Sequence, residues 1–302
     1  MPADVLYVHG VGQRCGEARL KRRWDHALFG REMGDRSRMA YWGAGAHAQG
    51  LTGAAEESAE VVRTAEVASA TEPASPEDFT SAVADRLRGT RLTPWLRRMS
   101  YAAEALAEGR LALPPPPPGP EARELLGGST RLLFRALIEV VFREAYAYFF
   151  GGSGEEMRQV VRDALAGLQS PVIVCHSFGT VIAYDVLREP ASRSLTVPLL
   201  VTAGSPLGVN EVAAEVQQPL RVPDAVAEWL NVADARDVVT LNHGLRAEYP
   251  PPDRLRDVDV RNDSPTHHSI VAYLRTQAVR GPVRAVVPPV GGEPGEEPPD
   301  AA

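Results

Sequence analysis

The stretch that decides the fold is Pro171-Val-Ile-Val-Cys-His-Ser177-Phe-Gly-Thr-Val-Ile-Ala-Tyr184. Its first part is an apolar, β-branched run typical of a buried strand, and its second part has the composition of a helix. Ser-x-Gly lies between them. A sharp strand-to-helix turn at this place is the context of a nucleophile elbow, which projects a serine hydroxyl above the carboxyl edge of a sheet. We therefore interpret Ser177 as a nucleophile and expect its hydroxyl to be accessible. The alternative is an ordinary helix N-cap serine.

Three neighbours of Ser177 bear on this interpretation. Gly179 is expected because the turn brings the new helix against adjacent strands, where a Cβ would collide. Cys175 stands where the G-x-S-x-G pattern has its first glycine, which is a departure from that pattern. His176 directly precedes the serine. Because adjacent residues at such a turn point in different directions, we interpret His176 as a structural neighbour and not as the base.

Strands and helices alternate outward from this stretch. We expect strands at 5–8, 38–42, 172–175, 197–202, 229–232 and 255–260, and helices at 132–150, 178–188 and 269–279. Ser153-Gly-Glu-Glu156 has capping-box spacing, so we also expect Ser153 to cap a helix that follows it. Apolar strands alternating with helices predict an α/β protein with a mostly parallel sheet flanked by helices on both faces.

The elements divide the chain into four parts. Residues 1–42 are the expected first part of the α/β core and residues 131–280 the remainder. Residues 43–130 are rich in Ala and Glu and interrupted by prolines, which predicts a helical cap insertion. Within it, Pro114–Pro118 favours a stiff linker, with a docking site for a proline-recognising domain as the alternative. Residues 281–302, rich in Pro, Gly and Glu, are expected to be a disordered tail.

Composition excludes several classes of protein. The 302 residues are 44% apolar, and 32 basic against 39 acidic residues give a net charge of −7. This argues against a nucleic-acid partner, because phosphate binding depends on clustered Lys and Arg. Two cysteines, Cys15 and Cys175, cannot build a disulfide scaffold. The beginning of the sequence lacks a secretory signal pattern, and no apolar run approaches the ~18 residues of a membrane span. We expect a cytoplasmic protein without a transmembrane segment, leaving transient membrane contact and the oligomeric state open.

A serine nucleophile needs a base and an orienting acid, which follow it in chain order Ser, Asp or Glu, His. Two carboxylates, Asp234 and Asp237, come after the strand at 229–232. Asp234 sits near the strand end and is equally suited to cap the turn. Asp237 lies deeper in the loop, ahead of an apolar pair that anchors it. We therefore favour Asp237 as the acid.

The base is expected in the loop after the last strand, where His267 and His268 precede a helix. We favour His268 and keep His267 as the alternative. His243 follows the acid's strand too soon to leave room for another strand between acid and base. No cluster of His, Cys and Asp has metal-ligand spacing, so we expect no metal.

Acyl transfer passes through a tetrahedral anion, which fixed N–H donors stabilise. The amide of Phe178, the residue after the nucleophile, is one expected donor. His9-Gly-Val-Gly12 follows the first strand, and its glycines free the backbone so that the Val11 amide can turn toward Ser177. A dinucleotide-binding loop would need a third glycine at position 15, where the chain has Cys15, so we expect no nucleotide cofactor.

Five segments together resemble bacterial α/β-hydrolases of the lipase and serine-esterase type, with GPI inositol-deacylase-like lipases as loose relatives. The segments are Val8-His-Gly-Val-Gly-Gln13, Cys175-His-Ser-Phe-Gly179, Gly204-Ser-Pro-Leu207, Asn231-Val-Ala-Asp-Ala-Arg-Asp-Val-Val239 and His268-Ser-Ile-Val-Ala-Tyr-Leu274. The resemblance covers residues 4–12 and about 145–275 but not the insertion. It implies an α/β-hydrolase fold in which Ser177, Asp237 and His268 form the catalytic triad and the Val11 and Phe178 amides form the oxyanion hole.

The expected activity is hydrolysis of a carboxylic ester through an acyl-enzyme on Ser177. The apolar helix at 132–150 and the insertion would shape a pocket for a hydrophobic or lipid-like acyl chain, so the expected partner is a small-molecule or lipid ester. The alternatives are a thioesterase, an amidase or peptidase, or an acyltransferase with the same triad. A non-catalytic scaffold that binds a protein partner is an alternative of a different class.

Overall fold

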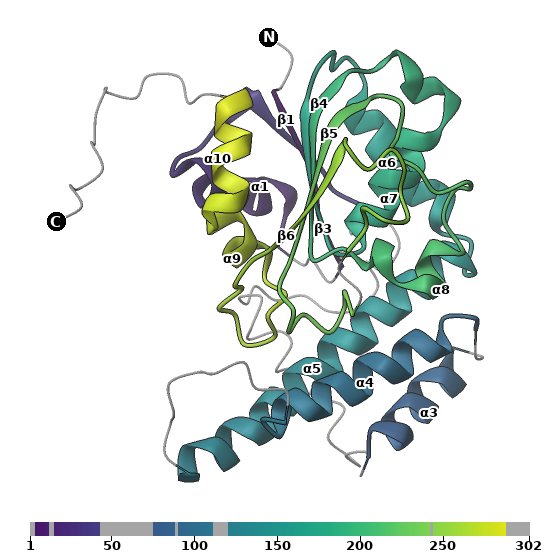
Figure 1. The fold of residues 1–302 in the computed structure, drawn as a ribbon, viewed down its shortest axis with the longest axis vertical. Helices are drawn as coiled ribbons and strands as arrows, with labels where there is room; N and C mark the ends of the chain where they lie inside the picture. Colours follow the sequence, from purple (N-terminus) through teal and green to yellow (C-terminus); the bar gives the residue numbers. More distant parts are fainter. Residues whose placement is uncertain are drawn as a thin grey trace, which may run out of the picture.

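The computed structural model describes residues 4–11, 15–42, 75–87, 90–110, 120–241 and 244–287. They form an α/β structure built on a six-stranded sheet in the order β2-β1-β3-β4-β5-β6, with every neighbouring pair parallel (Figure 1). The strands are β1 (Val5–Val8), β2 (Ser37–Ala40), β3 (Val172–His176), β4 (Val197–Ala203), β5 (Val226–Ala233) and β6 (Leu255–Asp259). The expected α/β class with a parallel sheet is confirmed.

Helices flank this sheet on both faces. The α-helices of the described residues are α1 (Glu17–Phe29), α3 (Pro76–Arg86), α4 (Thr93–Ala107), α5 (Pro120–Phe149), α6 (Gly154–Leu165), α7 (Gly179–Arg188), α8 (Asn210–Ala213), α9 (Ile270–Arg275) and α10 (Gln277–Val286). Alternation along the strands assigns the faces, because successive side chains of a strand point to opposite sides. In β1, Val5 and Tyr7 pack in a core with α1, α9 and α10, whereas Leu6 and Val8 pack in a second core with α6 and α7.

The order of strands places a topological switch point between β1 and β3. The chain leaves β1 through α1 and pairs β2 on one side of it, and later enters β3 on the other side. Loops that leave the carboxyl ends of two such strands diverge, and the crevice between them is where open α/β sheets bind ligands. The loop after β1 carries Gly10 and Val11, and the turn after β3 carries Ser177. The topology therefore brings the two expected halves of the site together.

Three helices from the middle of the chain lie beyond the carboxyl ends of the strands (Figure 1). α4 packs against both α3 and α5. Trp95 of α4 is fully buried and donates its indole N–H to the carbonyl of Val239, in the loop after β5, at 3.3 Å. Arg98 of α4 also pairs with Glu211 of α8 at 2.6 Å. These contacts hold the helices against the edge of the sheet where Ser177 lies.

Several expected boundaries differ from the structure. The boundary between residues 130 and 131 falls inside α5, which is continuous from Pro120. The helix expected at 269–279 is two helices separated at Thr276, and the second continues to Val286, so residues 281–286 are not tail. The sequence signal for this continuation is the buried series Val279, Val283 and Val287, which recurs every four residues. Residues 43–74, Pro114–Pro118, His243 and residues 288–302 lie outside the described residues.

Two local expectations at helices need correction as well. Ser153 has helical backbone angles (φ −84°, ψ −7°) and makes no side-chain cap on α6, so the capping box does not form. A cap residue must have extended backbone angles for its side chain to reach the free amides, and Ser153 does not. Helix α1 was not expected from the sequence. Its buried face, including Leu20, Trp24 and Leu28, has regular helical spacing.

Candidate active site

Ser177 lies on a sharp turn between β3 and α7, and the turn is fixed from both sides. Ser177 has φ +51°, a left-handed conformation that is uncommon for a residue with a side chain. Its amide donates to the carbonyl of Ala203 on β4 at 3.0 Å. Its own carbonyl accepts from the Thr180 hydroxyl at 2.6 Å. This is the geometry expected of an elbow, and an ordinary N-cap serine would have extended backbone angles instead.

The glycine at 179 is required by close approach. A Cβ on Gly179 would lie 2.1 Å from the carbonyl oxygen of His9, at the end of β1. No side chain fits there, as expected from the sequence. Cys175, which replaces the first glycine of the usual pattern, is fully buried in β3, and burial raises the pKa of its thiol. The turn therefore forms with cysteine at this position, and Cys175 and Cys15 are both free thiols.

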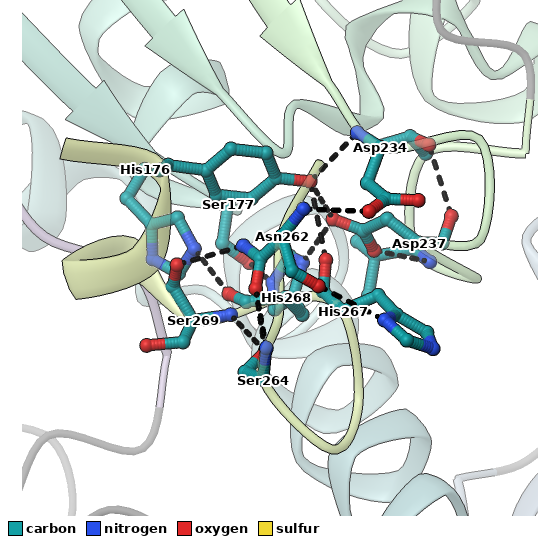
Figure 2. A network of polar contacts seen from close by, with 12 residues as sticks. His176, Ser177, Asp234, Asp237, Asn262, Ser264, His267, His268 and Ser269 are labelled. Carbon is teal, nitrogen blue, oxygen red and sulfur yellow. Dashed lines mark hydrogen bonds and ion pairs between the residues drawn. The ribbon is translucent and has the colours of Figure 1, made fainter. Parts of the chain in front are cut away.

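Ser177, His268 and Asp237 form a continuous hydrogen-bonded series (Figure 2). The Nε2 atom of His268 is 2.8 Å from the Ser177 Oγ atom. Its Nδ1 atom is 2.7 Å from the Oδ2 atom of Asp237. The other carboxylate oxygen of Asp237 accepts from the backbone amide of Val239 at 3.0 Å. The structure thus joins the three favoured residues, which come from the ends of three different strands.

Asp234 serves a different purpose from Asp237. Its carboxylate accepts from Arg236, at 2.6 Å to Oδ2, and from the backbone amide of Asn262 at 2.7 Å. Burial by itself would raise the pKa of Asp234, but these hydrogen bonds outweigh it and the pKa is lowered. Asp234 therefore links the loop after β5 to the loop after β6, and it does not contact His268.

His267 also lies away from Ser177. It has φ +55°, and its Nδ1 atom contacts the backbone carbonyl of Asn262 at 3.0 Å. Fully buried Asn262 additionally donates from its side chain to the carbonyl of Ser269 at 2.8 Å and accepts from Ser264 at 2.6 Å. These bonds on both sides of the histidine pair hold the loop so that His268 faces the serine (Figure 2).

His176 supports this loop from the sheet. Its Nε2 atom donates to the backbone carbonyl of His268 at 2.8 Å, and the two imidazole rings are 4.7 Å apart. Burial, and next the neighbouring His268, hold the pKa of His176 well below its usual value, so the ring is neutral. His176 does not contact the Ser177 hydroxyl, and its place agrees with the expected role of structural neighbour.

The loop that carries Val11 passes directly beside the serine. A Cβ on Gly10 would be 2.7 Å from the Cβ of Ser177, so only glycine permits this approach. His9 fixes the loop, since its Nδ1 atom bonds the Gly10 carbonyl at 2.5 Å and its Nε2 atom accepts from the Trp42 amide at 3.1 Å. Burial lowers the pKa of His9 to about 4, although its bond to Gly10 opposes this. The neutral ring therefore has one tautomer, with the proton on Nδ1.

Phe178, the residue after the serine, packs against the end of α5. The rings of Tyr148 and Phe149 meet the Phe178 ring edge-on, with centroids 5.4 and 5.8 Å apart. The Phe178 amide donates to no backbone acceptor within the described part of the chain. Both amides expected to bind an oxyanion, those of Val11 and Phe178, thus belong to segments that border Ser177.

The hydroxyl of Ser177 is covered, contrary to the expectation of an accessible nucleophile. Ser177 has 0% of its surface exposed and His268 has 5%. Gly10 and His268 lie directly against Ser177, and at the same edge of the sheet α4 packs on the loop after β5 through Trp95 and α5 packs on Phe178. The sequence predicted an insertion but gave no indication of how closely it packs on the sheet edge.

Two further residues shape the site without any motif to identify them. Gly204 ends β4 with φ +58°, and a Cβ there would lie 3.0 Å from the Oδ2 atom of Asp237 and 3.1 Å from the His268 ring. Tyr273 of α9 donates from its hydroxyl to the same Asp237 oxygen at 2.7 Å. Both lie within segments that resemble the hydrolases, yet the contacts join residues more than thirty positions apart, which spacing alone does not reveal.

Across the described ranges, no group of three or more His, Cys, Asp or Glu residues is placed to hold a metal ion. None of the helices in those same ranges is long and apolar enough to cross a membrane.

Comparisons with known proteins show no family for this chain. No family model matches it, and no solved structure matches it significantly. Over 215 residues, 67% of this chain, it is 31% identical to the sodium/potassium-transporting ATPase subunit alpha-1 of Anguilla anguilla. The chain spans only about one fifth (20%) of the length of that relative. A match to so small a part of a much longer protein does not bear on the chemistry of Ser177.

Proposed function

We propose that this protein is a serine hydrolase with the α/β-hydrolase fold, which cleaves a carboxylic ester through an acyl-enzyme on Ser177. The observation that carries the proposal is the series from Ser177 Oγ to His268 Nε2 (2.8 Å) and from His268 Nδ1 to Asp237 Oδ2 (2.7 Å). Ser177, where this series starts, has a left-handed backbone conformation and lies beside the topological switch point between β1 and β3. Such series arise on many folds where a serine must be made nucleophilic, so geometry and not sequence position supports the proposed chemistry.

The proposed reaction follows from the hydrogen bonds. Neutral His268 accepts the Ser177 proton on Nε2 while Oγ attacks the ester carbonyl carbon. The imidazolium that forms is stabilised by the Asp237 carboxylate, and it then gives its proton to the departing alkoxide as the tetrahedral intermediate collapses. Water, activated by the same imidazole, attacks the acyl-enzyme and releases the acid, and Ser177 regains its proton.

The oxyanion of each tetrahedral intermediate needs fixed donors. In this proposal the Phe178 amide provides one and the Val11 amide the other. Gly10 permits the loop of Val11 to pass beside Ser177, and the bonds of His9 to Gly10 and Trp42 hold it there. Donors fixed before the reaction are typically worth about 10²–10³ each in rate.

The covered hydroxyl adds a requirement for movement. Substrate reaches Ser177 only if part of the structure that covers it moves, and α4 and α5 lie beyond the carboxyl edge of the sheet where Ser177 sits. We propose that these helices belong to a cap, whose opening admits the ester and whose closure excludes water from competing steps. The Arg98–Glu211 pair is half exposed on the Arg98 side, and ion pairs that water can reach contribute little to stability, which is compatible with such movement.

A fluorophosphonate probe tests the nucleophile and its accessibility together. The wild-type protein should be labelled at Ser177, and Ser177→Ala should not. Ser205→Ala is a matched control, because Ser205 is also buried (2% exposed) and lies 2.8 Å from the Thr180 hydroxyl that bonds the Ser177 carbonyl. It should be labelled like the wild type. Labelling that persists in Ser177→Ala, or a wild-type protein that is never labelled, refutes the proposed hydrolase.

The aromatic end of α5 supports a hydrophobic acyl group. Phe149 and Phe150 are partly exposed at this end, and Phe149 contacts Phe178. A series of model esters of increasing acyl length should show rising kcat/KM with chain length, and Phe149→Ala should flatten that rise. Thioesters and amides of the same acyl chain, run in parallel, distinguish ester hydrolysis from the related acyl transfers. Preference for the shortest acyl group would contradict a hydrophobic acyl site.

A further inference from the structure

Tyr273 makes a contact that the proposed reaction does not itself require. It lies on α9, and its side chain is fully buried. Its hydroxyl is 2.7 Å from the Oδ2 atom of Asp237, which is the same oxygen that lies 2.7 Å from His268 Nδ1. The hydroxyl also accepts from the backbone amide of Asp234 at 3.1 Å. One phenol thus joins the loop after β5 to the helix that follows His268.

The single proton of this phenol has two acceptors within reach. The Asp237 oxygen is closer (2.7 Å) than the backbone carbonyl of His267 (3.2 Å). A carboxylate is also the stronger acceptor, because hydrogen bonds to ionised groups are shorter and about twice as strong as neutral ones. The pKa of Tyr273 is raised well above its usual value by burial and next by Asp237. The phenol therefore remains a donor to Asp237 throughout the working pH range.

We propose that Tyr273 is a positioning residue of the site, which sets the basicity of His268 by sharing the Asp237 oxygen with it. This inference rests on the proposed function of Ser177, His268 and Asp237. Donation from the phenol spreads the negative charge of the carboxylate and weakens its hold on an imidazolium. It also holds Oδ2 beside the Nδ1 atom of His268, while the Val239 amide holds Oδ1. Tyr273 acts through Asp237 and touches neither the substrate nor the serine.

Removal of the phenol has a defined consequence. Without it, Oδ2 of Asp237 has His268 as its remaining partner among the hydrogen bonds described here. The full charge of that oxygen then stabilises the imidazolium, so the pKa of His268 should rise. A larger fraction of the base would be protonated at neutral pH and unable to accept the Ser177 proton. The acid limb of the pH profile should consequently move to higher pH.

Other charged and titratable groups face this histidine and must be considered. His176 packs on it from β3 but is neutral, because burial lowers its pKa. Asp234 lies in the same loop as Asp237, and its charge is paired with Arg236. His267 precedes it in the chain and points to the Asn262 carbonyl. None of these groups bonds the Oδ2 atom of Asp237, so Tyr273 is the group whose removal tests that oxygen directly.

The test compares Tyr273→Phe with Tyr249→Phe. Tyr249 is a matched control because it is also fully buried and donates to one acceptor, the backbone carbonyl of Leu207 at 2.8 Å, away from Asp237. In Tyr273→Phe, kcat for a model ester on the acid side of the profile should fall by up to about threefold with KM nearly unchanged, which is the factor that a half-unit rise in the pKa of the base produces. The acid limb of its kcat/KM profile should move to higher pH by roughly half a pH unit or more. Tyr249→Phe should show neither change.

A second measurement does not depend on activity. Nitrogen-15 NMR titration of the histidines reports the pKa of His268 directly, and a strongly deshielded proton should mark its bond to Asp237. Tyr273→3-fluorotyrosine keeps the hydroxyl and makes it a stronger donor, so the pKa of His268 should shift downward, opposite to its shift in Tyr273→Phe. This variant preserves the buried shape and keeps the test available if Tyr273→Phe does not fold.

The outcomes separate the two ideas. The role of Tyr273 is overturned if Tyr273→Phe has the same pH profile and the same His268 titration as the wild type. It is also overturned if the pKa of His268 shifts in the same direction in both Tyr273 variants. If the wild type neither hydrolyses esters nor reacts with fluorophosphonate, the proposed function fails. The NMR shifts would still report whether Tyr273 controls the proton affinity of the His268–Asp237 pair.

Discussion

Two buried aspartates in this protein are held in nearly the same way, yet only one is linked through a histidine to a buried serine hydroxyl. Asp25 of α1 accepts from the Tyr7 hydroxyl at 2.9 Å, from the Ser37 hydroxyl at 2.7 Å and from Lys21 at 3.0 Å. Asp237 accepts from the Tyr273 hydroxyl and from a backbone amide, and its last partner is His268. Each carboxylate thus accepts a hydrogen bond from a buried tyrosine. The two differ in one further partner, which is Lys21 for Asp25 and His268 for Asp237.

That last partner determines what each cluster can do. Lys21 carries a fixed positive charge, so the Asp25 cluster is complete and serves to join α1 to β1 and β2. An imidazole changes its protonation near neutral pH and has a second nitrogen, which at His268 reaches Ser177. Position adds to this difference. Asp25 lies against one face of the sheet, whereas Asp237 lies at the carboxyl edge, which is the edge where open α/β sheets bind ligands.

The largest expected effect is on turnover in Asp237→Asn. The amide would favour the tautomer of His268 that cannot accept the Ser177 proton, so kcat should fall by about 10³–10⁴ with the thermal midpoint nearly unchanged. Asp234→Asn is the control, since Asp234 bonds Arg236 and not His268. Steady-state kinetics on a model ester measure both variants. A larger loss of turnover in Asp234→Asn would show that the acid is misassigned.

Asp25→Asn should show the opposite pattern. An amide N–H would face donors, Lys21 and the backbone amide of Met33, and leave the buried cluster uncompensated. We expect a loss of about 3 kcal/mol in the free energy of unfolding, measured by urea denaturation. The kcat per folded molecule should stay within about twofold of the wild type. An Asp25→Asn variant with unchanged stability and impaired turnover would contradict a purely structural role for Asp25.

Acid pH should destabilise the folded protein through the part of the sheet near Asp237, because two buried neutral histidines, His9 and His176, lie at that end. The pKa of His9 is about 4 in the folded protein against 6.5 when unfolded. The unfolded chain binds the proton more readily, so stability is complete above pH 6.5 and is lost as the pH falls toward 4. The loss from His9 alone is about 3 kcal/mol.

Urea denaturation between pH 7 and 4 measures this loss, with His176 steepening the slope in the same direction. His9→Gln removes one titrating group and should reduce the slope. A free energy of unfolding that does not change over this range would contradict the burial of both rings.

The smallest expected effect compares two glycines with positive φ. Gly30 ends α1, the helix of Asp25, with φ +78° and open space around it, whereas Gly204 has φ +58° and borders Asp237 and His268. Alanine should cost about 1 kcal/mol of stability at either position. Only Gly204→Ala should also displace the Asp–His contact, and we expect its kcat to fall about tenfold. Equal kcat in the two variants would show that the contact tolerates the added carbon.

Much of the fold was predictable because buried parallel strands are short apolar runs. The strand at 5–8 matches β1 without change, and those around Ser177 and Asp237 differ from β3 and β5 only at their ends. The choice of Asp237 over Asp234 was predictable in part, since an apolar pair follows Asp237. The geometry agrees with it, because Val239 of that pair donates its amide to the carboxylate.

Other features could not be read from the sequence because they depend on contacts between distant residues. Tyr273 follows a helical pattern that any apolar residue would satisfy, and only the fold brings its hydroxyl to Asp237. The burial of Ser177 is a property of the folded edge of the sheet, where Trp95 bonds the Val239 carbonyl and Phe149 packs on Phe178. The end of the last helix was misplaced because Gly281 and Pro282 indicate a break, whereas burial of Val279 and Val283 sustains the helix.

The left-handed backbone conformation of Ser177 costs folding free energy at the residue that carries the proposed nucleophilic hydroxyl. A serine held at φ +51° destabilises the folded state by about 1 kcal/mol or more compared with glycine, which adopts this conformation freely. A glycine variant relieves this strain, but it also loses the bond between Ser177 Oγ and His268 Nε2 at 2.8 Å. On the proposed function, selection by thermal survival alone does not protect the hydroxyl, so directed evolution for robustness should include a screen for turnover at every round.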